Sequence, residues 1–143
     1  MLILSNTLEF HGGTTFILRL CREMHRRGQN VGVLVLIGQI NKELRAEIGK
    51  YASLYFLKDY IRFFSDRAFR TQMGIFLPHD NSALVELADQ YGSHLHAMGV
   101  FGLLFAANLS HHSGHDLKIS TGIYHQNEFM FRCVDYFFAR ECY

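Results

Sequence analysis

Proline is almost absent from this chain, and neither acidic nor basic residues dominate its charge. One proline among 143 residues, of which 49% are hydrophobic, excludes a disordered segment, because disorder needs low hydrophobicity and high net charge. The formal net charge is only +1, so no global field attracts nucleic acid, and nucleic-acid binding is not expected. A chain of this length is expected to form one domain with its own core.

Cysteine and long apolar runs are also scarce. The three cysteines, Cys21, Cys133 and Cys142, are an odd number without CxxC spacing. They predict small buried thiols in a reducing compartment rather than a disulfide framework. No run approaches the ~18 apolar residues that span a bilayer, and the short apolar start lacks the basic residues of a signal peptide. A cytoplasmic protein is therefore expected.

Short apolar runs alternate with amphipathic segments along the chain. Strands are expected over residues 2–4, 31–37, 53–57, 94–98 and 117–124. After a first helix that follows Gly12-Gly13, further helices are expected over residues 41–50, 58–73, 82–89, 100–109 and 128–138, with a loop at 110–116. This alternation predicts a Rossmann-like three-layer α/β domain: an open, mostly parallel sheet, its first strand central, with helices on both faces.

The first helix is the most clearly marked element. Gly12-Gly13 indicates a turn, and Thr14 or Thr15 is expected to cap the helix that follows. Arg26-Arg27-Gly28 should end it, with cations at the negative end of the helix dipole and a glycine that can adopt positive φ. The apolar residues recur at helical spacing and are expected to face the core: Phe16, Ile17, Leu20, Cys21 and Met24.

In such sheets, ligands bind beyond the carboxyl ends of the strands, which draws attention to loops 6–14, 97–99 and 125–128. Gly12-Gly13 lets the backbone approach a ligand, and the helix start suits a phosphate. The motif is neither G-x-G-x-x-G nor a Walker loop, so it implies no dinucleotide or ATP site, and no cofactor is expected. The alternative is a plain strand-to-helix turn.

Histidines and polar residues follow or occupy the later strands. His94 and His96 should point to the same face of a strand, either toward the carboxyl-end crevice or as structural residues. After the last strand, His125, Asn127 and Glu128 could offer a neutral imidazole, an amide and a carboxylate to a sugar hydroxyl, although Asn127 also suits the cap of the last helix.

Two other polar clusters have simpler explanations. The group of His111, His112, His115 and Asp116 lies in one short loop without a second distant cluster, so no metal site is expected. Arginines and aromatics alternate over 58–73, which suits peripheral contact with the inner face of a membrane. The alternative for 58–73 is a helix covered by a neighbouring segment.

The order of these features resembles the amino-terminal domain of GT-B glycosyltransferases, especially those of glycosyltransferase family four. Over residues 2–37 the resemblance is carried by the apolar strand, Gly12-Gly13-Thr14, the helix ending in Arg-Arg-Gly, and the valine-rich run 31–36. Over 93–128 it is carried by His94-Leu95-His96-Ala97 and by Thr121-Gly122-Ile123-Tyr124-His125. The middle of the chain matches only in length and helical character.

The resemblance implies where the substrates would bind. In that family the first domain mainly holds the acceptor, the Gly-Gly loop lies against the donor's phosphates, and the histidine that ends the later strand lies near the transferred sugar. Gly12, Gly13 and the adjoining Thr14 thus become candidate substrate-binding residues, His96 matches the acceptor-domain strand, and His125 is the candidate catalytic residue.

The family's second domain binds most of the nucleotide sugar and carries a paired-glutamate motif, and nothing in this sequence corresponds to it. Residues 1–143 are therefore expected to be the acceptor-side half, inactive alone, of an enzyme that moves a sugar from a nucleotide-sugar donor to a glycan or lipid-linked acceptor. The alternatives are the non-donor subunit of a split glycosyltransferase and a non-enzymatic α/β binding or regulatory module. The aromatic residues of 128–138, with Phe101, could also form a homodimer surface.

Overall fold

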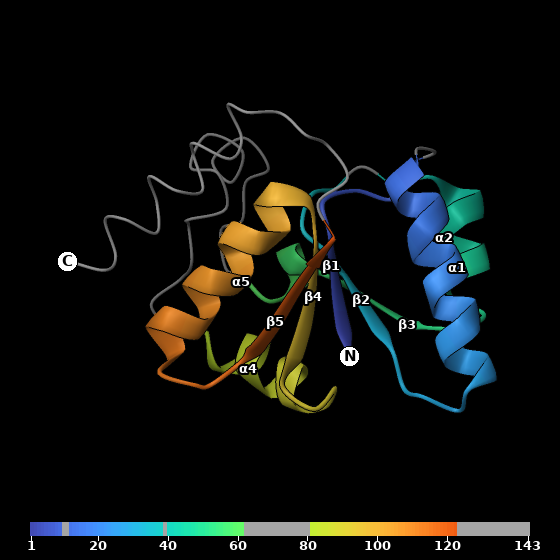
Figure 1. Ribbon diagram of the computed structural model, residues 1–143. Coiled ribbons are helices and arrows are strands. Elements are labelled where there is room, and N and C mark those ends of the chain that lie inside the picture. Colours follow the sequence, from blue (N-terminus) through green and yellow to red (C-terminus); the bar gives the residue numbers. More distant parts are fainter. Residues whose placement is uncertain (10–11, 39, 62–80, 123–143) are drawn as a thin grey trace.

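A computed structural model describes residues 1–9, 12–38, 40–61 and 81–122 of the chain. Strands and helices alternate along these ranges (Figure 1). In chain order the elements are β1 (Leu2–Ser5), α1 (Gly12–Arg26), β2 (Gly32–Val35), α2 (Lys42–Ile48), β3 (Ser53–Phe56), the 3₁₀ turn η1 (Leu57–Asp59), α4 (Ser82–Asp89), β4 (His94–Met98), α5 (Gly99–Ser113) and β5 (Lys118–Gly122).

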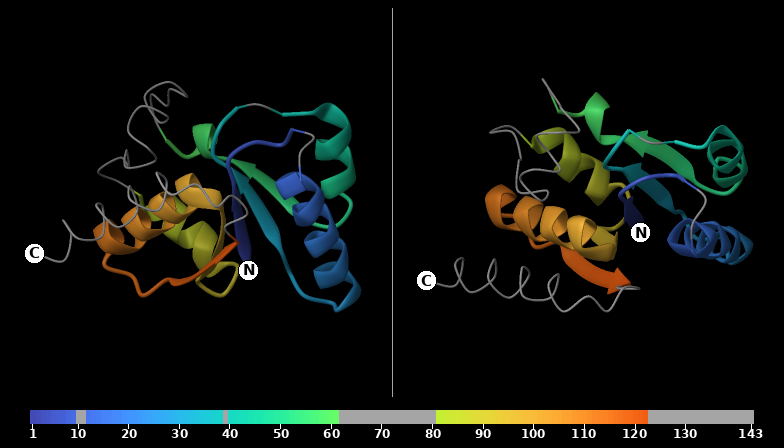
Figure 2. Two further views of the ribbon diagram at one scale, coloured as in Figure 1. Left: turned by 45° about the horizontal axis from the view of Figure 1, so that its top comes forward. Right: turned by 90° about the horizontal axis from the view of Figure 1, so that it is seen from above.

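The strands form one five-stranded, all-parallel sheet in the order β3-β2-β1-β4-β5. The helices α1 and α2 lie on one side of this sheet, and α4 and α5 lie on the other (Figures 1 and 2). This arrangement confirms the predicted Rossmann-like α/β fold, including the central place of β1.

Alternate residues of the central strand enter two separate cores. Leu2 and Leu4 pack in the cluster that contains the buried residues of α4 and α5, such as Phe105. Ile3 packs in the other cluster, with Ile17 and Cys21 of α1. Because both faces are covered, β1 reads as a continuous apolar run rather than an alternating one.

Two glycines allow close packing on the α4/α5 face. A Cβ built on Gly102 of α5 would lie 3.3 Å from the carbonyl oxygen of Leu4, so this helix packs directly on β1. A Cβ on Gly32 of β2 would lie 2.6 Å from Cζ of Tyr91. The Tyr91 ring thus rests on the strand, and its hydroxyl is 2.9 Å from the hydroxyl of Tyr55.

The start of α1 differs from the prediction, and so does one residue of its predicted apolar face, because Ile17 and Cys21 are buried and Leu20 and Met24 pack against the core while Phe16 does not. The helix begins at Gly12, so Thr14 and Thr15 lie inside its first turn and do not cap it. Thr14, Ile17 and Cys21 form the buried face, whereas Phe16 is 37% exposed. With 3.6 residues per turn, Phe16 lies about 200° around the helix from Thr14, which directs it away from the sheet.

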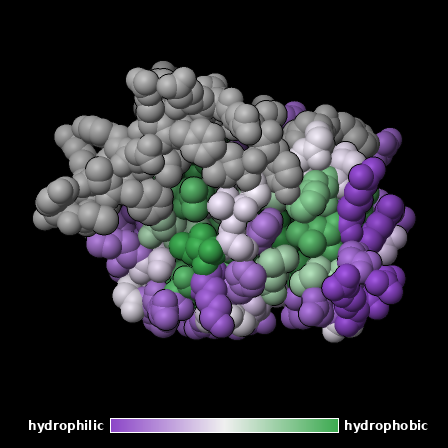
Figure 3. All heavy atoms as spheres, in the orientation of Figure 1, coloured by the Kyte–Doolittle hydropathy of each residue, from purple (hydrophilic) through white to green (hydrophobic). Residues whose placement is uncertain are grey.

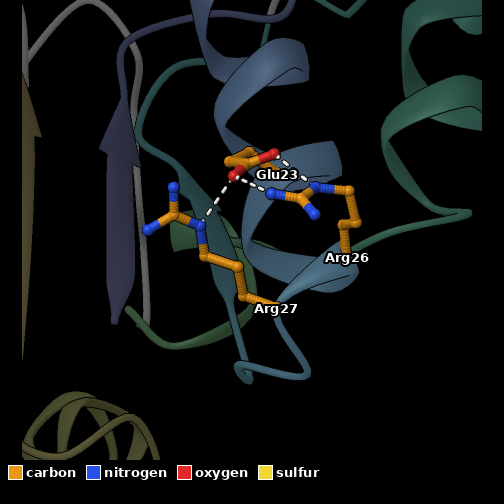
Figure 4. A network of polar contacts seen from close by, with 3 residues as sticks. All are labelled: Glu23, Arg26 and Arg27. Carbon is orange, nitrogen blue, oxygen red and sulfur yellow. Dashed lines mark hydrogen bonds and ion pairs between the residues drawn. The ribbon is translucent and has the colours of Figure 1, made fainter.

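The predicted end of α1 is confirmed. Gly28 has a φ of +67°, which favours glycine. Glu23 accepts hydrogen bonds from Arg26 and Arg27 at the last turn (Figure 4). Hydrogen bonds from Arg26 and then Arg27 lower the pKa of Glu23 to about 2. All three side chains are well exposed, so this network marks the helix end more than it stabilises the fold.

The other helices follow the predictions with one correction. The α2 helix is capped by Asn41, whose Oδ1 accepts hydrogen bonds from the backbone of Glu43 and Leu44. The predicted loop at 110–116 was wrong in its first half, because α5 continues to Ser113. Serine and histidine are tolerated in the last turn, and the helix ends only where Gly114 adopts a φ of +67°.

Two predicted helices, 58–73 and 128–138, fall largely or wholly outside the described residues. Of 58–73, only 58–61 are described: Lys58 and Asp59 belong to the 3₁₀ turn η1, Tyr60 ends it, and Ile61 is buried.

Among the residues that the structure describes, no helix is both long enough and apolar enough to cross a membrane. Hydrophobic side chains reach the surface between the strands and α1, while hydrophilic ones cover the outside of that helix (Figure 3).

Candidate functional site

The carboxyl ends of β1 and β4 are neighbours at one edge of the sheet. From β1 the chain leaves through α1 on one face of the sheet, and from β4 it leaves through α5 on the other. Two neighbouring parallel strands whose connections diverge in this way form a topological switch point, where α/β proteins bind ligands. The end of β5, at Gly122, lies at the same edge because β5 is parallel to β4.

The Gly-Gly pair lies at this edge, at the first turn of α1. Gly12 is exposed, and a Cβ built on it would meet no atom within 4 Å. Packing therefore does not require glycine there, and the space beside its backbone is open. The first turn of a helix presents backbone N–H groups and a positive dipole end, which suit an anion. Thr14 follows with its side chain fully buried.

The two strand histidines converge on one serine of the neighbouring strand. Ser120 of β5 lies in register with His96 of β4. Its Oγ is 2.8 Å from Nε2 of His94 and 2.9 Å from Nδ1 of His96. The predicted common orientation of His94 and His96 is confirmed, and both project from the side of the sheet on which Met98 joins the α1 core.

Burial keeps these imidazoles neutral near pH 7. Desolvation is the main cause that lowers the pKa of His96, and the neighbouring His94 adds a smaller contribution. Desolvation also lowers the pKa of His94, with smaller contributions from the amino-terminal charge and from Lys118. A neutral imidazole has one donor and one acceptor nitrogen, which is the form that can bind a hydroxyl.

Two buried side-chain atoms in the described part of the chain have no hydrogen-bond partner: Nε2 of His96 and Oδ1 of Asn6. Asn6 directly follows β1, and His96 lies opposite Ile3 of β1. At about 3.3 Å per strand residue, the two positions are separated by roughly 10 Å along the strands. Buried polar atoms are normally satisfied, so each of these two atoms offers a place for a ligand group or an ordered water.

Sequence reasoning did not select Asn6 or Ser120 as site residues. Asn6 belongs to the loop 6–14, and Ser120 opens the polar stretch that contains His125, but neither has a distinctive motif. The signal that identifies Ser120 is its register with His96, which depends on the pairing of β4 with β5. The predicted His125, Asn127 and Glu128 lie outside the described residues, so their roles stay predictions.

Other polar features lie away from this edge. A shallow hollow of about 660 Å³ is lined by residues that include His25 in the last turn of α1, Asn30 after α1, and Tyr51 and Ser53 after α2, at the amino edge of the sheet. His111 and His112 pack against each other at the end of α5, with ring centroids 5.1 Å apart. Within the described ranges, no group of three or more His, Cys, Asp or Glu side chains is placed to hold a metal ion.

Comparisons with known proteins leave the family of this chain open. No family model matches the sequence, and no curated protein matches it. Any functional conclusion therefore depends on the fold, on the geometry at the carboxyl edge, and on the motifs that carry the resemblance.

Proposed function

We propose that this chain is the acceptor-side domain of a nucleotide-sugar-dependent glycosyltransferase. In this function the carboxyl edge at β1 and β4 holds the sugar acceptor, and the start of α1 contacts the diphosphate of a donor that is bound mainly by a second domain or subunit. The observations that support the proposal are the Gly12-Gly13 helix start beyond β1, the unpartnered Oδ1 of Asn6 directly after β1, and the unpartnered Nε2 of His96 on the neighbouring strand β4.

The chemistry of these groups fits the two ligands separately. The backbone of Gly12 and Gly13 opens a helix at the carboxyl edge, and this suits a diphosphate without any cationic side chain. Asn6 and His96 are neutral hydrogen-bonding groups, and they suit the hydroxyls of a sugar. Neither group supplies a nucleophile or a metal, so the proposed role of this domain is to bind and orient. Orientation of reacting groups can contribute roughly 7–11 kcal/mol to catalysis when both substrates are held.

The first experiment compares nucleotide-sugar binding by two variants that each introduce a valine, in different places. Gly12→Val adds a side chain at the open helix start, and Ala46→Val adds two methyl groups on an exposed position of α2. Weak binding of UDP-glucose or GDP-mannose to the chain is expected to be lost in Gly12→Val and kept in Ala46→Val. Equal binding by both variants would contradict a diphosphate site at Gly12.

A second experiment tests the expected dependence on a donor domain. The purified chain, incubated with nucleotide sugars and glycan or lipid-linked acceptors, should form no glycoside detectable by mass spectrometry, because the donor is not held in place. Sugar transfer by the chain alone would overturn the acceptor-side assignment. Binding of neither substrate class would favour the alternative of a non-enzymatic α/β module.

A further inference from the structure

One hydroxyl joins the two histidines of β4. Ser120 Oγ lies within hydrogen-bond distance of both His94 Nε2 and His96 Nδ1. A serine hydroxyl has a single hydrogen to donate, so at most one imidazole accepts it and at least one donates its own N–H to the serine oxygen. Ser120 therefore couples the tautomers of the two rings, because both rings cannot present an unprotonated nitrogen to it at once.

This coupling determines what His96 can offer to a ligand. Because Nδ1 is engaged by Ser120, Nε2 is the ring atom left for another partner, and it is buried without one. If Ser120 donates to Nδ1, then Nε2 carries a hydrogen and is a donor. If Nδ1 donates to Ser120, then Nε2 is an acceptor. In both arrangements the orientation of the ring is fixed by a bond from the neighbouring strand.

We propose that His94 and Ser120 are positioning residues that hold His96 in one tautomer, so that its Nε2 binds a hydroxyl of the acceptor sugar. This inference rests on the proposed function and names the atom that recognises the acceptor. A hydroxyl both donates and accepts, so it complements Nε2 in either tautomer. Burial lowers the pKa of both imidazoles, which favours an uncharged ligand over an anion that would stabilise the imidazolium.

Asn6 is a second polar residue near β4 with an unsatisfied buried atom. Its Oδ1 is a buried acceptor without a partner, and it lies beyond the end of β1, next to the strand that carries His96. Its position beyond the end of β1 makes it a candidate contact for a polar ligand at the carboxyl edge.

The positioning role is tested without any ligand by ¹⁵N NMR of the histidine rings, which distinguishes the two neutral tautomers. We expect one tautomer of His96 to dominate in the natural chain and in Ser120→Thr, which keeps the hydroxyl. Ser120→Ala should give a mixture of both tautomers. His112→Gln is the matched control, because His112 bonds to the Asn108 carbonyl oxygen in the last turns of α5 and does not contact Ser120. An unchanged tautomer in Ser120→Ala would overturn the positioning role.

The ligand is tested with methyl glycosides of glucose, galactose, mannose and N-acetylglucosamine at millimolar concentration. For whichever glycoside binds, Ser120→Ala should weaken binding about fivefold to tenfold, whereas Ser120→Thr and His112→Gln should not. His94→Gln should weaken it too, and provides a second variant if Ser120→Ala fails to fold. Binding that is equal in Ser120→Ala and the natural chain would overturn this inference but leave the proposed function standing. Binding of no glycoside by the natural chain would overturn the acceptor site itself.

Discussion

The contact between Gly32 and Tyr91 gives a quantitative test of the packing on the α4/α5 face. In Gly32→Ala, the new Cβ would lie 2.6 Å from Cζ and 2.9 Å from Cε2 of Tyr91, both far below van der Waals contact. The ring is 6% exposed, so it cannot move without disturbing the core. Its movement would also break the 2.9 Å hydrogen bond to Tyr55.

The opposing effects can be compared. Overpacking a core typically costs about 1–3 kcal/mol, and the lost hydrogen bond costs about 1 kcal/mol. Replacing glycine by alanine lowers the entropy of the unfolded chain and offsets about 0.4–1 kcal/mol. Gly32→Ala should therefore lower the free energy of unfolding by about 1–3.5 kcal/mol, which corresponds to roughly 2–4 °C in Tm for each kcal/mol.

Urea denaturation followed by circular dichroism measures this change. Gly12→Ala is the matched control, because its Cβ would meet no atom within 4 Å, and its stability should equal or slightly exceed that of the natural chain. In a Tyr91→Leu background, which removes the ring edge, the cost of Gly32→Ala should largely disappear. A Gly32→Ala chain as stable as the natural one, or a cost that persists undiminished with Tyr91→Leu, would refute this packing.

Two further predictions follow from the buried titratable groups. Burial lowers the pKa of His96 below its ordinary value near 6.5, so the unfolded chain binds more protons and the stability of the fold should fall as the pH drops below about 6.5. Urea titrations at several pH values should show a weaker decline in His96→Gln than in the natural chain. An identical decline in both chains would contradict this origin. Burial raises the pKa of the Cys21 thiol to about 12, so iodoacetamide at pH 8 should modify Cys21 only after denaturation. Mass spectrometry of the labelled peptides measures this reaction. Rapid labelling of Cys21 in the native chain would show that the thiol is accessible and would contradict the prediction.

The fold could be predicted from the sequence because its signals are local and repeated. Apolar runs of strand length alternate with helical segments, and right-handed connections leave few arrangements for a parallel sheet. The central position of β1 follows from the same rules. The stop at Gly28 was predictable, because a glycine after two arginines is a strong local signal.

The details that failed depend on information that a local pattern does not contain. Only Phe16 of the predicted apolar face of α1 was misplaced, because hydrophobicity alone does not tell whether a residue at the edge of the apolar stripe is covered. The length of α5 was underestimated because polar residues in a last turn are tolerated until a glycine ends the helix. Ser120 and Asn6 became visible only through strand pairing and burial.

The location of ligand binding tests the central claim most directly. Amide NMR spectra of the chain, titrated separately with UDP-glucose and with methyl glycosides, would show which backbone groups each ligand perturbs. The acceptor-side assignment predicts that nucleotide sugars perturb Gly12 and Gly13, and that glycosides perturb Asn6, His96 and Ser120. Perturbations confined to the amino-edge hollow around Asn30 and Tyr51, or none from either ligand, would contradict the assignment.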